Sequence, residues 1–333
     1  VLVGYHLIGS YDIRPAWCDL DADGDRDLVV GFGPGSLSLL LLLTMQDLEV
    51  VDVQVIPGAN DRYAYAWGET FPACGDVDGD GLAELAIGLG EGSTASISML
   101  DDHESGYAPM TTAFRSLVRT LPTTATLGLQ YWETGAAKPV LADVDGDGRD
   151  EIVVGRSAGG RGTISVFDDA ETGFVVMLPL SPSEGVIDAV TDADYRYLDG
   201  ATEVAAGDVD GDGRAEIVVA TRRAGETGID VIDDALTGFA PLLESAVQIA
   251  PDGGAGAPLE LLDPGLGDID GDGRLEVSLG MGATEGGLGR VQVLDDLETG
   301  FAPLVWTADE EGIVEAPAEA GIVWPAIEAN PQP

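Results

Sequence analysis

Short apolar runs recur along the chain, and each is followed by a glycine or by a turn rich in glycine and serine. Residues 152–154 (IVV) and 217–219 (IVV) are two such runs. A second segment then alternates apolar and polar residues, as in 163–167 (TISVF) and 290–294 (RVQVL). A period of two is typical of β-strands, and no segment keeps a helical period long enough to form a substantial helix. The pattern predicts a protein built from short strands.

A repeated turn motif follows the alternating strand. Two aspartates begin the motif, and a glycine and an aromatic residue end it. Aspartate initiates turns and glycine supplies a positive φ, so we expect a hairpin whose aromatic residue begins a fourth strand. The residues at 44–48 (TMQDL) lack the motif, so the first repeat is degenerate there. The four copies are Asp101–Tyr107, Asp168–Phe174, Asp233–Phe239 and Asp295–Phe301.

An acidic nonapeptide separates the first two predicted strands of each repeat. In its third copy, DVDGDGRDE at 143–151, three aspartates alternate, a glycine follows the third, and another carboxylate stands at position 9. Ca²⁺ takes about six to eight oxygen ligands, which alternating carboxylates before a sharp turn can supply. The copies start 57 to 67 residues apart and are named here loops 1 to 5: Asp19–Asp27, Asp76–Glu84, Asp143–Glu151, Asp208–Glu216 and Asp268–Glu276.

Four short antiparallel strands in about 60 residues are typical of a β-propeller blade, whereas solenoid coils repeat in about 20 to 30 residues. We therefore predict an all-β protein, a β-propeller of four-stranded antiparallel blades. Five blades is the plain count, and six or seven stay open. The propeller is expected to span 1–306, with repeats at about 1–56, 57–121, 122–189, 190–250 and 251–306. The segment 307–333 is expected to be a closing strand or a linker.

The loop motif D-x-D-x-D-G-x-x-[DE], followed by an apolar run and glycine, resembles the FG-GAP/VCBS repeats of integrin α-subunit propellers and of many secreted bacterial proteins. The resemblance covers about residues 14–306. An EF-hand is disfavoured because position 12 of the third copy is the apolar Val154 and strand-like runs flank the loops.

The resemblance implies one Ca²⁺ per repeat, five in all, held by the side chains at positions 1, 3, 5 and 9 and by the backbone carbonyl of position 7. Ala22 stands where the other loops have glycine, so some strain is expected in loop 1. The side-chain ligands implied are Asp19, Asp21, Asp23 and Asp27; Asp76, Asp78, Asp80 and Glu84; Asp143, Asp145, Asp147 and Glu151; Asp208, Asp210, Asp212 and Glu216; and Asp268, Asp270, Asp272 and Glu276. The carbonyl ligands implied are Asp25, Leu82, Arg149, Arg214 and Arg274.

Composition narrows the class of partner. The 333 residues are 45% hydrophobic, as in a folded protein, yet the formal net charge is −45. Such a charge repels nucleic acids and anionic membrane surfaces, so we expect neither as a partner. The leucine-rich run at 37–43 is too short to span a bilayer and is predicted to be a buried strand, so no membrane insertion is expected.

Two cysteines, Cys18 and Cys74, lie just before loops 1 and 2. They form either a disulfide that joins neighbouring repeats or two buried thiols. The alternative stays open because Cys18 lies one residue before its loop and Cys74 lies two residues before its loop, which could point the two side chains to opposite faces of their strands. The chain begins at Val1 with neither an initiator methionine nor a signal peptide, so a mature or trimmed form is expected.

Three functions agree with these features. The first is a secreted or cell-surface scaffold, stabilised by Ca²⁺, for adhesion, surface assembly or filament assembly; it would bind a protein or glycan ligand, or copies of itself. The second is a lectin, and the third is a polysaccharide lyase, because propellers that resemble this one include both. One lysine and two histidines leave few bases for proton abstraction, so we predict no enzymatic activity and no catalytic residues.

Two further features were weighed as sites. The G-x-S-x-G match at 155–159 is followed by a strand-like segment and not by a helix, so a nucleophilic serine is not expected. Aromatic residues precede several loops in the segments between repeats. They either line a rim that binds a ligand or pack between adjacent blades, and we favour the packing role. They are Tyr5, Tyr65, Trp67, Tyr131, Trp132, Tyr195 and Tyr197.

Overall fold

Antiparallel strands make up most of the part of the chain that the computed structural model describes, namely residues 13–47, 49–58, 68–91, 93, 96–110, 117–119, 135–157, 160, 162–177, 187–188, 200–223, 226–243, 247–249, 262–281, 290–304 and 313–315. Over these residues there is no α-helix, only one turn of 3-10 helix, η2 (Leu297–Thr299). The chain divides into two compact units, Val1–Ile249 and Ala250–Pro333, and each is described separately.

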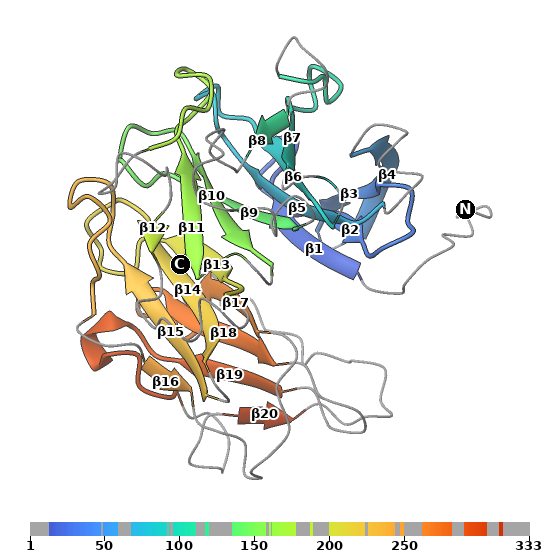
Figure 1. The fold of residues 1–333 in the computed structure, drawn as a ribbon. Coiled ribbons are helices and arrows are strands. Elements are labelled where there is room, and N and C mark those ends of the chain that lie inside the picture. Colours follow the sequence, from blue (N-terminus) through green and yellow to red (C-terminus); the bar gives the residue numbers. More distant parts are fainter. Residues whose placement is uncertain are drawn as a thin grey trace. The chain divides into compact units, whose positions relative to one another are not determined.

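The strands form five four-stranded antiparallel sheets, four in the first unit and one in the second (Figure 1). In every sheet the strands are neighbours in the order in which they occur in the sequence. The first two sheets are β1 (Ile13–Cys18), β2 (Asp27–Phe32), β3 (Leu39–Gln46) and β4 (Glu49–Pro57), and β5 (Thr70–Gly75), β6 (Glu84–Leu89), β7 (Ser96–Leu100) and β8 (Leu117–Arg119). The next two are β9 (Ala137–Ala142), β10 (Glu151–Arg156), β11 (Thr163–Phe167) and β12 (Ile187–Asp188), and β13 (Glu203–Gly207), β14 (Glu216–Arg223), β15 (Glu226–Ile232) and β16 (Val247–Ile249). The second unit contains β17 (Leu262–Gly267), β18 (Glu276–Met281), β19 (Arg290–Leu294) and β20 (Ile313–Glu315). The prediction of five groups of four antiparallel strands is confirmed.

In repeats 2 to 5 the fourth strands, β8, β12, β16 and β20, are only two or three residues long and begin well after the hairpin turn, whereas β4 of repeat 1 is nine residues long. In the second unit this strand, β20, falls within the segment 307–333 that was expected to be a tail or closing strand. Apart from β20, the segment 307–333 lies outside the described residues.

Neighbouring sheets of the first unit share their cores. Ile152 and Val154 of β10 pack in one cluster with Ile97 and Met99 of the preceding sheet. Val153, whose side chain points to the opposite face, packs in another cluster with residues of the following sheet. The strand is therefore buried on both faces, which explains why it reads as a continuous apolar run and not as an alternation.

The hairpin motif forms a turn, but its aromatic residue does not begin a strand as predicted. Phe174 follows Gly173 and both have positive φ, 59° and 77°, so the chain is still turning at the aromatic ring. Phe174 is buried in the cluster that contains Val77 of loop 2, and that packing offsets the cost of its left-handed conformation. After the turn, Val176 makes only an isolated bridge with Phe167, and the fourth strand comes later.

Repeat 1 lacks this hairpin, as expected. Its third and fourth strands are joined directly after Gln46, which pairs with Glu49. The leucine-rich run forms β3, and Leu40 and Leu42 are buried in the core that repeats 1 and 2 share. The prediction of a buried strand is confirmed for residues 39–43, whose side chains are buried or half-buried, but Leu37 precedes the strand and is exposed. Among the described residues, no helix could span a membrane.

The two cysteines form a disulfide, which settles the alternative left open above. Cys18 ends β1 and Cys74 lies in β5, with their Cα atoms 6.1 Å apart. The bond links the first strands of neighbouring sheets within the first unit. Disulfides persist in oxidising compartments, and this one fits such a location.

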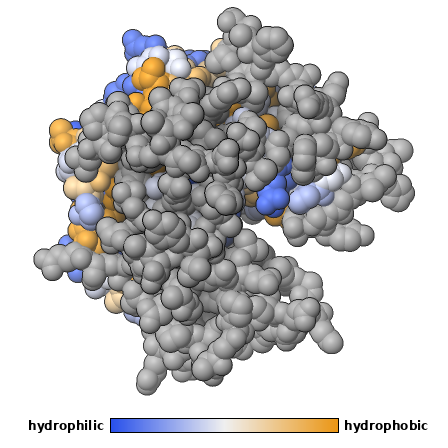
Figure 2. Space-filling view, in the orientation of Figure 1, coloured by the Kyte–Doolittle hydropathy of each residue, from blue (hydrophilic) through white to orange (hydrophobic). Residues whose placement is uncertain are grey.

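Apolar side chains also reach the surface of the described residues, beside polar ones, on the face drawn in Figure 2. Over all described residues, the large apolar side chains that are most exposed include Leu236 in a hairpin turn and Val51 on the outer strand β4.

Candidate metal centre

Each acidic loop joins the first strand of a sheet to the second. In loop 2, Asp76 directly follows β5 and Glu84 begins β6. Loops 1, 3, 4 and 5 are placed in the same way between β1 and β2, β9 and β10, β13 and β14, and β17 and β18. The four carboxylates of each loop are thus held between two paired strands, as expected.

The position 1 aspartate organises each loop. In loop 2, Asp76 Oδ1 accepts a hydrogen bond from Gly79 N at 2.7 Å, and Asp76 Oδ2 accepts one from Gly81 N at 2.9 Å. Both glycines have positive φ, 81° and 90°, which other residues rarely adopt. Loops 3, 4 and 5 repeat both hydrogen bonds. The glycines at positions 4 and 6 therefore bend the backbone around the first carboxylate.

The position 9 glutamate is buried beneath the loop. Glu84 and Glu151 have no exposed surface. In each, Oε2 accepts a hydrogen bond from the position 2 amide, Val77 N or Val144 N, at 2.8 Å. The other oxygen, Oε1, is buried and has no hydrogen-bond partner. Glu216 and Glu276 share both features.

The buried glutamate lies among other carboxylates. Oxygens of Asp76, Asp78 and Glu84 all lie within 4.8 Å of one another, and so do oxygens of Asp143, Asp145 and Glu151. Burial, with added repulsion from these aspartates, raises the pKa of Glu84 to about 8 and that of Glu151 to about 9. The same causes raise the pKa of Glu216 to about 7.

These residues fit a hard divalent cation. A buried carboxylate oxygen without a hydrogen-bond donor is costly, and close carboxylates repel one another. A cation with oxygen ligands removes both penalties at once, and the donor set consists only of oxygens, which suits Ca²⁺ or Mg²⁺. In loops 2 to 5 the residues that would hold it are those at positions 1, 3, 5 and 9.

Loop 1 departs from this pattern. Its position 9 residue, Asp27, uses both oxygens for backbone donors, Oδ2 for Leu20 N at 2.8 Å and Oδ1 for Met45 N at 2.7 Å. Ala22 adopts a φ of 56°, so the expected strain is present. In this loop the buried oxygen without a partner is Oδ1 of Asp21, at position 3.

The residues at position 7 belong to the same turns. Leu82 N and Arg149 N donate to the position 5 aspartates Asp80 and Asp147, at 2.9 and 3.0 Å. Asp25, Arg214 and Arg274 make the equivalent hydrogen bond. The arginine side chains at this position also form ion pairs with the hairpin that follows in the same repeat.

The structure brings the hairpin aspartates to the loops, which sequence reasoning missed because it explained them as turn residues. Oxygens of Asp80, Glu84 and Asp102 lie within 4.8 Å of one another, as do those of Asp147, Glu151 and Asp169. The second aspartate of each hairpin is almost completely buried, unlike an ordinary turn residue. The repeated Asp-Asp pair was the available signal.

The sequence offered a serine, two histidines and a set of aromatic residues as further candidates. Ser157 of the G-x-S-x-G match accepts a hydrogen bond from Ala136 N at 3.0 Å through its hydroxyl, and His103 lies in the hairpin of repeat 2. The seven aromatic residues considered for a rim lie outside the described residues, as does His6.

Comparisons with known proteins agree with the repeat pattern. The sequence model of the FG-GAP repeat family matches residues 136–167 and 200–229, which contain loops 3 and 4. No curated protein sequence matches the chain. Among solved structures, a crystal structure of the rhamnogalacturonan lyase YesW is similar over 85% of this chain, with 16% identity and a TM-score of 0.41. The chain spans 48% of that lyase's length.

Proposed function

Because this chain carries repeats of the FG-GAP family, we propose that it is an extracellular β-propeller domain that binds Ca²⁺ in its five loops and acts as a non-catalytic binding or structural scaffold. The cations would fasten the first two strands of each blade together. The scaffold would present its loops to a protein or glycan ligand at the cell surface, or assemble with copies of itself.

One observation carries the proposal of a cation. Four loops each bury a glutamate whose Oε1 has no hydrogen-bond partner. The elevated pKa values show how poorly these carboxylates tolerate ionisation without a counter-charge. Because a cation binds to the folded loop and not to the unfolded chain, its binding energy adds to the stability of the fold.

The proposal of a propeller rests on sheet order and packing. Each sheet has four antiparallel strands in sequential order, and sheets of the first unit pack face to face through shared apolar clusters. Both features are typical of propeller blades. Five sheets then correspond to five blades.

Four features support an extracellular, non-catalytic role. FG-GAP repeats are typical of extracellular proteins, and the Cys18–Cys74 disulfide suits an oxidising compartment. Lys138, the only lysine, is ion-paired with Glu203, which makes it a poor base for proton abstraction. Acidic loops that fasten two strands together through a cation need no substrate.

Thermal melting of metal-stripped protein, with and without added Ca²⁺, tests the proposal. We expect a large rise in Tm with Ca²⁺ and a smaller one with Mg²⁺, because Mg²⁺ demands a stricter geometry and gives up its water reluctantly. Calorimetric titration should show several binding sites per chain. A Tm that does not respond to either cation would refute the cation role.

A glycan array probed with the Ca²⁺-loaded and the chelated protein tests the scaffold role. Binding to a defined sugar class would replace the general scaffold with a lectin. Release of unsaturated products from acidic polysaccharides would refute the non-catalytic assignment.

A further inference from the structure

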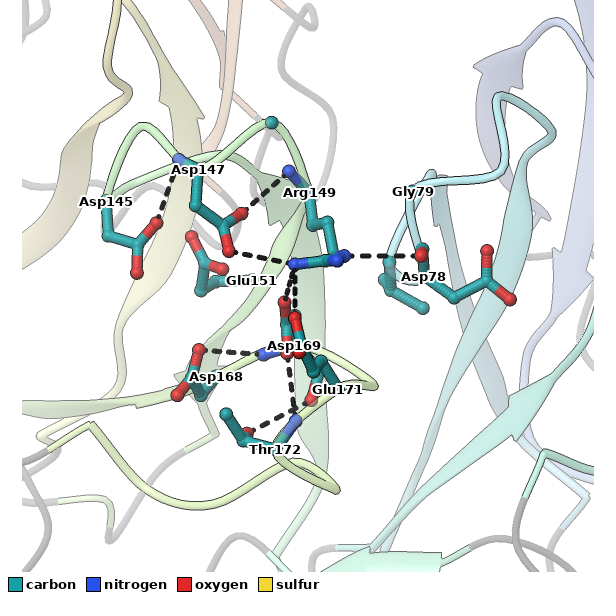
Figure 3. A network of polar contacts seen from close by, with 12 residues as sticks. Asp78, Gly79, Asp145, Asp147, Arg149, Glu151, Asp168, Asp169, Glu171 and Thr172 are labelled. Carbon is teal, nitrogen blue, oxygen red and sulfur yellow. Dashed lines mark hydrogen bonds and ion pairs between the residues drawn. The ribbon is translucent and has the colours of Figure 1, made fainter.

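The side chain of Arg149 leaves its own loop and reaches the loop of the preceding repeat. Arg149 Nε donates a hydrogen bond to the backbone carbonyl oxygen of Asp78, at position 3 of loop 2, over 3.2 Å. Figure 3 shows the guanidinium lying between this carbonyl and a group of carboxylates from its own repeat. Its Nη1 lies 3.1 Å from Asp147 Oδ2, 3.2 Å from Asp169 Oδ2 and 2.8 Å from Glu171 Oε2. One side chain therefore connects loop 2, loop 3 and a hairpin.

Arg214 repeats the arrangement one repeat later. Its Nε donates to the carbonyl oxygen of Asp145, position 3 of loop 3, at 3.2 Å. Its Nη1 pairs with Asp212 Oδ2 at 2.9 Å and with Asp234 Oδ2 at 3.5 Å. Two pairs of neighbouring repeats in the first unit, 2–3 and 3–4, show the same bridging hydrogen bond, so it is not an isolated contact.

The glycine at position 4 provides room for each bridge. A Cβ atom added to Gly79 would lie 3.0 Å from Arg149 Nε, and one added to Gly146 would lie 2.9 Å from Arg214 Nε. In the first pair of repeats, both residues of the bridge are different. Repeat 2 has Leu82 in place of the arginine, and loop 1 has Ala22 in place of the glycine. Within the first unit, the two substitutions occur together in the one pair of repeats for which the described residues show no bridge.

We propose that Arg149 and Arg214 are positioning residues for cation binding in the preceding loop, so that Arg149 acts on loop 2 and Arg214 acts on loop 3. The inference rests on the proposed cation role of the loops. Each arginine holds the backbone of the position 3 aspartate, whose carboxylate would be a ligand, in the conformation seen here. A loop that is already ordered loses less conformational entropy when it binds, so its affinity is higher.

Whether loss of the arginine weakens or strengthens Ca²⁺ binding distinguishes a positioning role from a purely electrostatic one. A guanidinium near a cation site repels the cation, so simple electrostatics predicts tighter binding when Arg149 becomes a neutral residue. Positioning predicts weaker binding. Arg149→Leu, which introduces the residue found at this position in repeat 2, therefore distinguishes the two by direction. Arg149→Lys keeps the charge but lacks the Nε–H donor. A positioning role therefore predicts that this variant also binds Ca²⁺ more weakly in loop 2.

The full-length chain labelled with ¹⁵N-glycine provides a readout for each loop. The amides of Gly79 and Gly81 report loop 2, those of Gly146 and Gly148 report loop 3, and those of Gly211 and Gly213 report loop 4. In a Ca²⁺ titration, Arg149→Leu should raise the half-filling concentration of loop 2 about fivefold, as expected for the loss of one hydrogen bond. Loop 4 should fill as in the unmodified chain.

Arg214→Leu is the matched variant. It should weaken Ca²⁺ binding in loop 3 and leave Ca²⁺ binding in loop 2 unchanged. It also gives an independent test if Arg149→Leu does not fold. Tighter or unchanged filling of the preceding loop in both variants would overturn the inference, and so would equal weakening of all loops, which indicates general destabilisation. If none of the glycine amides of the unmodified chain responds to Ca²⁺, the proposed cation role itself fails, which is a different outcome.

Discussion

The Asp150 carboxylate of loop 3 accepts a hydrogen bond from the backbone amide of Asp76, the first residue of loop 2, at 3.0 Å. The Asp150 amide in turn donates to the Asp76 carbonyl oxygen at 2.8 Å. Repeat 4 has Ala215 at the same position. It keeps only the backbone hydrogen bond, from the Ala215 amide to the Asp143 carbonyl oxygen at 2.8 Å. Burial raises the pKa of Asp150 to about 6. The beginning of one acidic loop is thus fastened to the end of the next.

Asp150→Ala should destabilise the Ca²⁺-saturated protein by about 1–3 kcal/mol, because it removes the acceptor for the Asp76 amide. Asp150→Asn keeps an oxygen that can accept the same hydrogen bond and should cost clearly less. Urea denaturation at saturating Ca²⁺ measures both. Equal losses for the two variants would show that the carboxylate matters for its charge and not as an acceptor.

Glu151→Gln should have opposite effects with and without Ca²⁺. In the metal-free protein above neutral pH, the variant should melt at a higher temperature, because it removes a buried carboxylate whose ionisation is unfavourable. In Ca²⁺ it should weaken filling of loop 3 by about tenfold or more, since a charged ligand is lost. Melting in both conditions, with calorimetric titration, checks the reversal.

Asp27→Asn in loop 1 is the contrasting variant. Both Asp27 oxygens accept backbone hydrogen bonds, so an amide group in place of one of them loses a bond in either condition. We expect a loss of about 1–3 kcal/mol with and without Ca²⁺. Stabilisation of the metal-free protein by this variant would contradict the description of loop 1.

The stability of the metal-free protein should fall as the pH rises. Glu84, Glu151 and Glu216 have folded-state pKa values of about 8, 9 and 7, above the value near 4.5 of an ordinary glutamate. The folded state therefore holds protons that the unfolded chain has already released. This stability is fully present below about pH 4.5 and is lost progressively as the pH rises through 7 to 9.

A series of melting curves from pH 5 to 9 on metal-stripped protein tests this trend. Saturating Ca²⁺ should abolish or reverse it, because the cation competes with protons for the same oxygens. A Tm of the stripped protein that rises with pH over this range would contradict it.

Removal of the Cys18–Cys74 disulfide should destabilise the first unit by about 2–5 kcal/mol. The bond closes a stretch of 56 residues and links the first strands of two neighbouring sheets. Melting with and without reductant, and of the Cys18→Ser/Cys74→Ser double variant, measures the cost. Because the loops keep all their carboxylates, Ca²⁺ should still raise the Tm of the double variant.

Local patterns were sufficient to predict the first three strands of each repeat and the position of the loops, but not where the fourth strand begins. The acidic nonapeptides, the apolar runs after them and the Asp-Asp turns are all read from residues close together in sequence, and they place Asp76 directly after one strand and Glu84 at the start of the next. Gly79 and Ala22 likewise take the left-handed conformations expected, since these depend on local sterics.

Contacts between repeats could not be predicted in this way. Nothing near Arg149 in sequence indicates that its Nε reaches Asp78, 71 residues earlier. The same applies to the packing of Phe174 on the core around Val77, which keeps the aromatic residue in the turn, and to the facing of Cys18 and Cys74. Sequence alone determined the acidic loops and their strands because the forces that shape them are local. Only tertiary structure decided which side chains join one repeat to the next, because that depends on how the sheets stack.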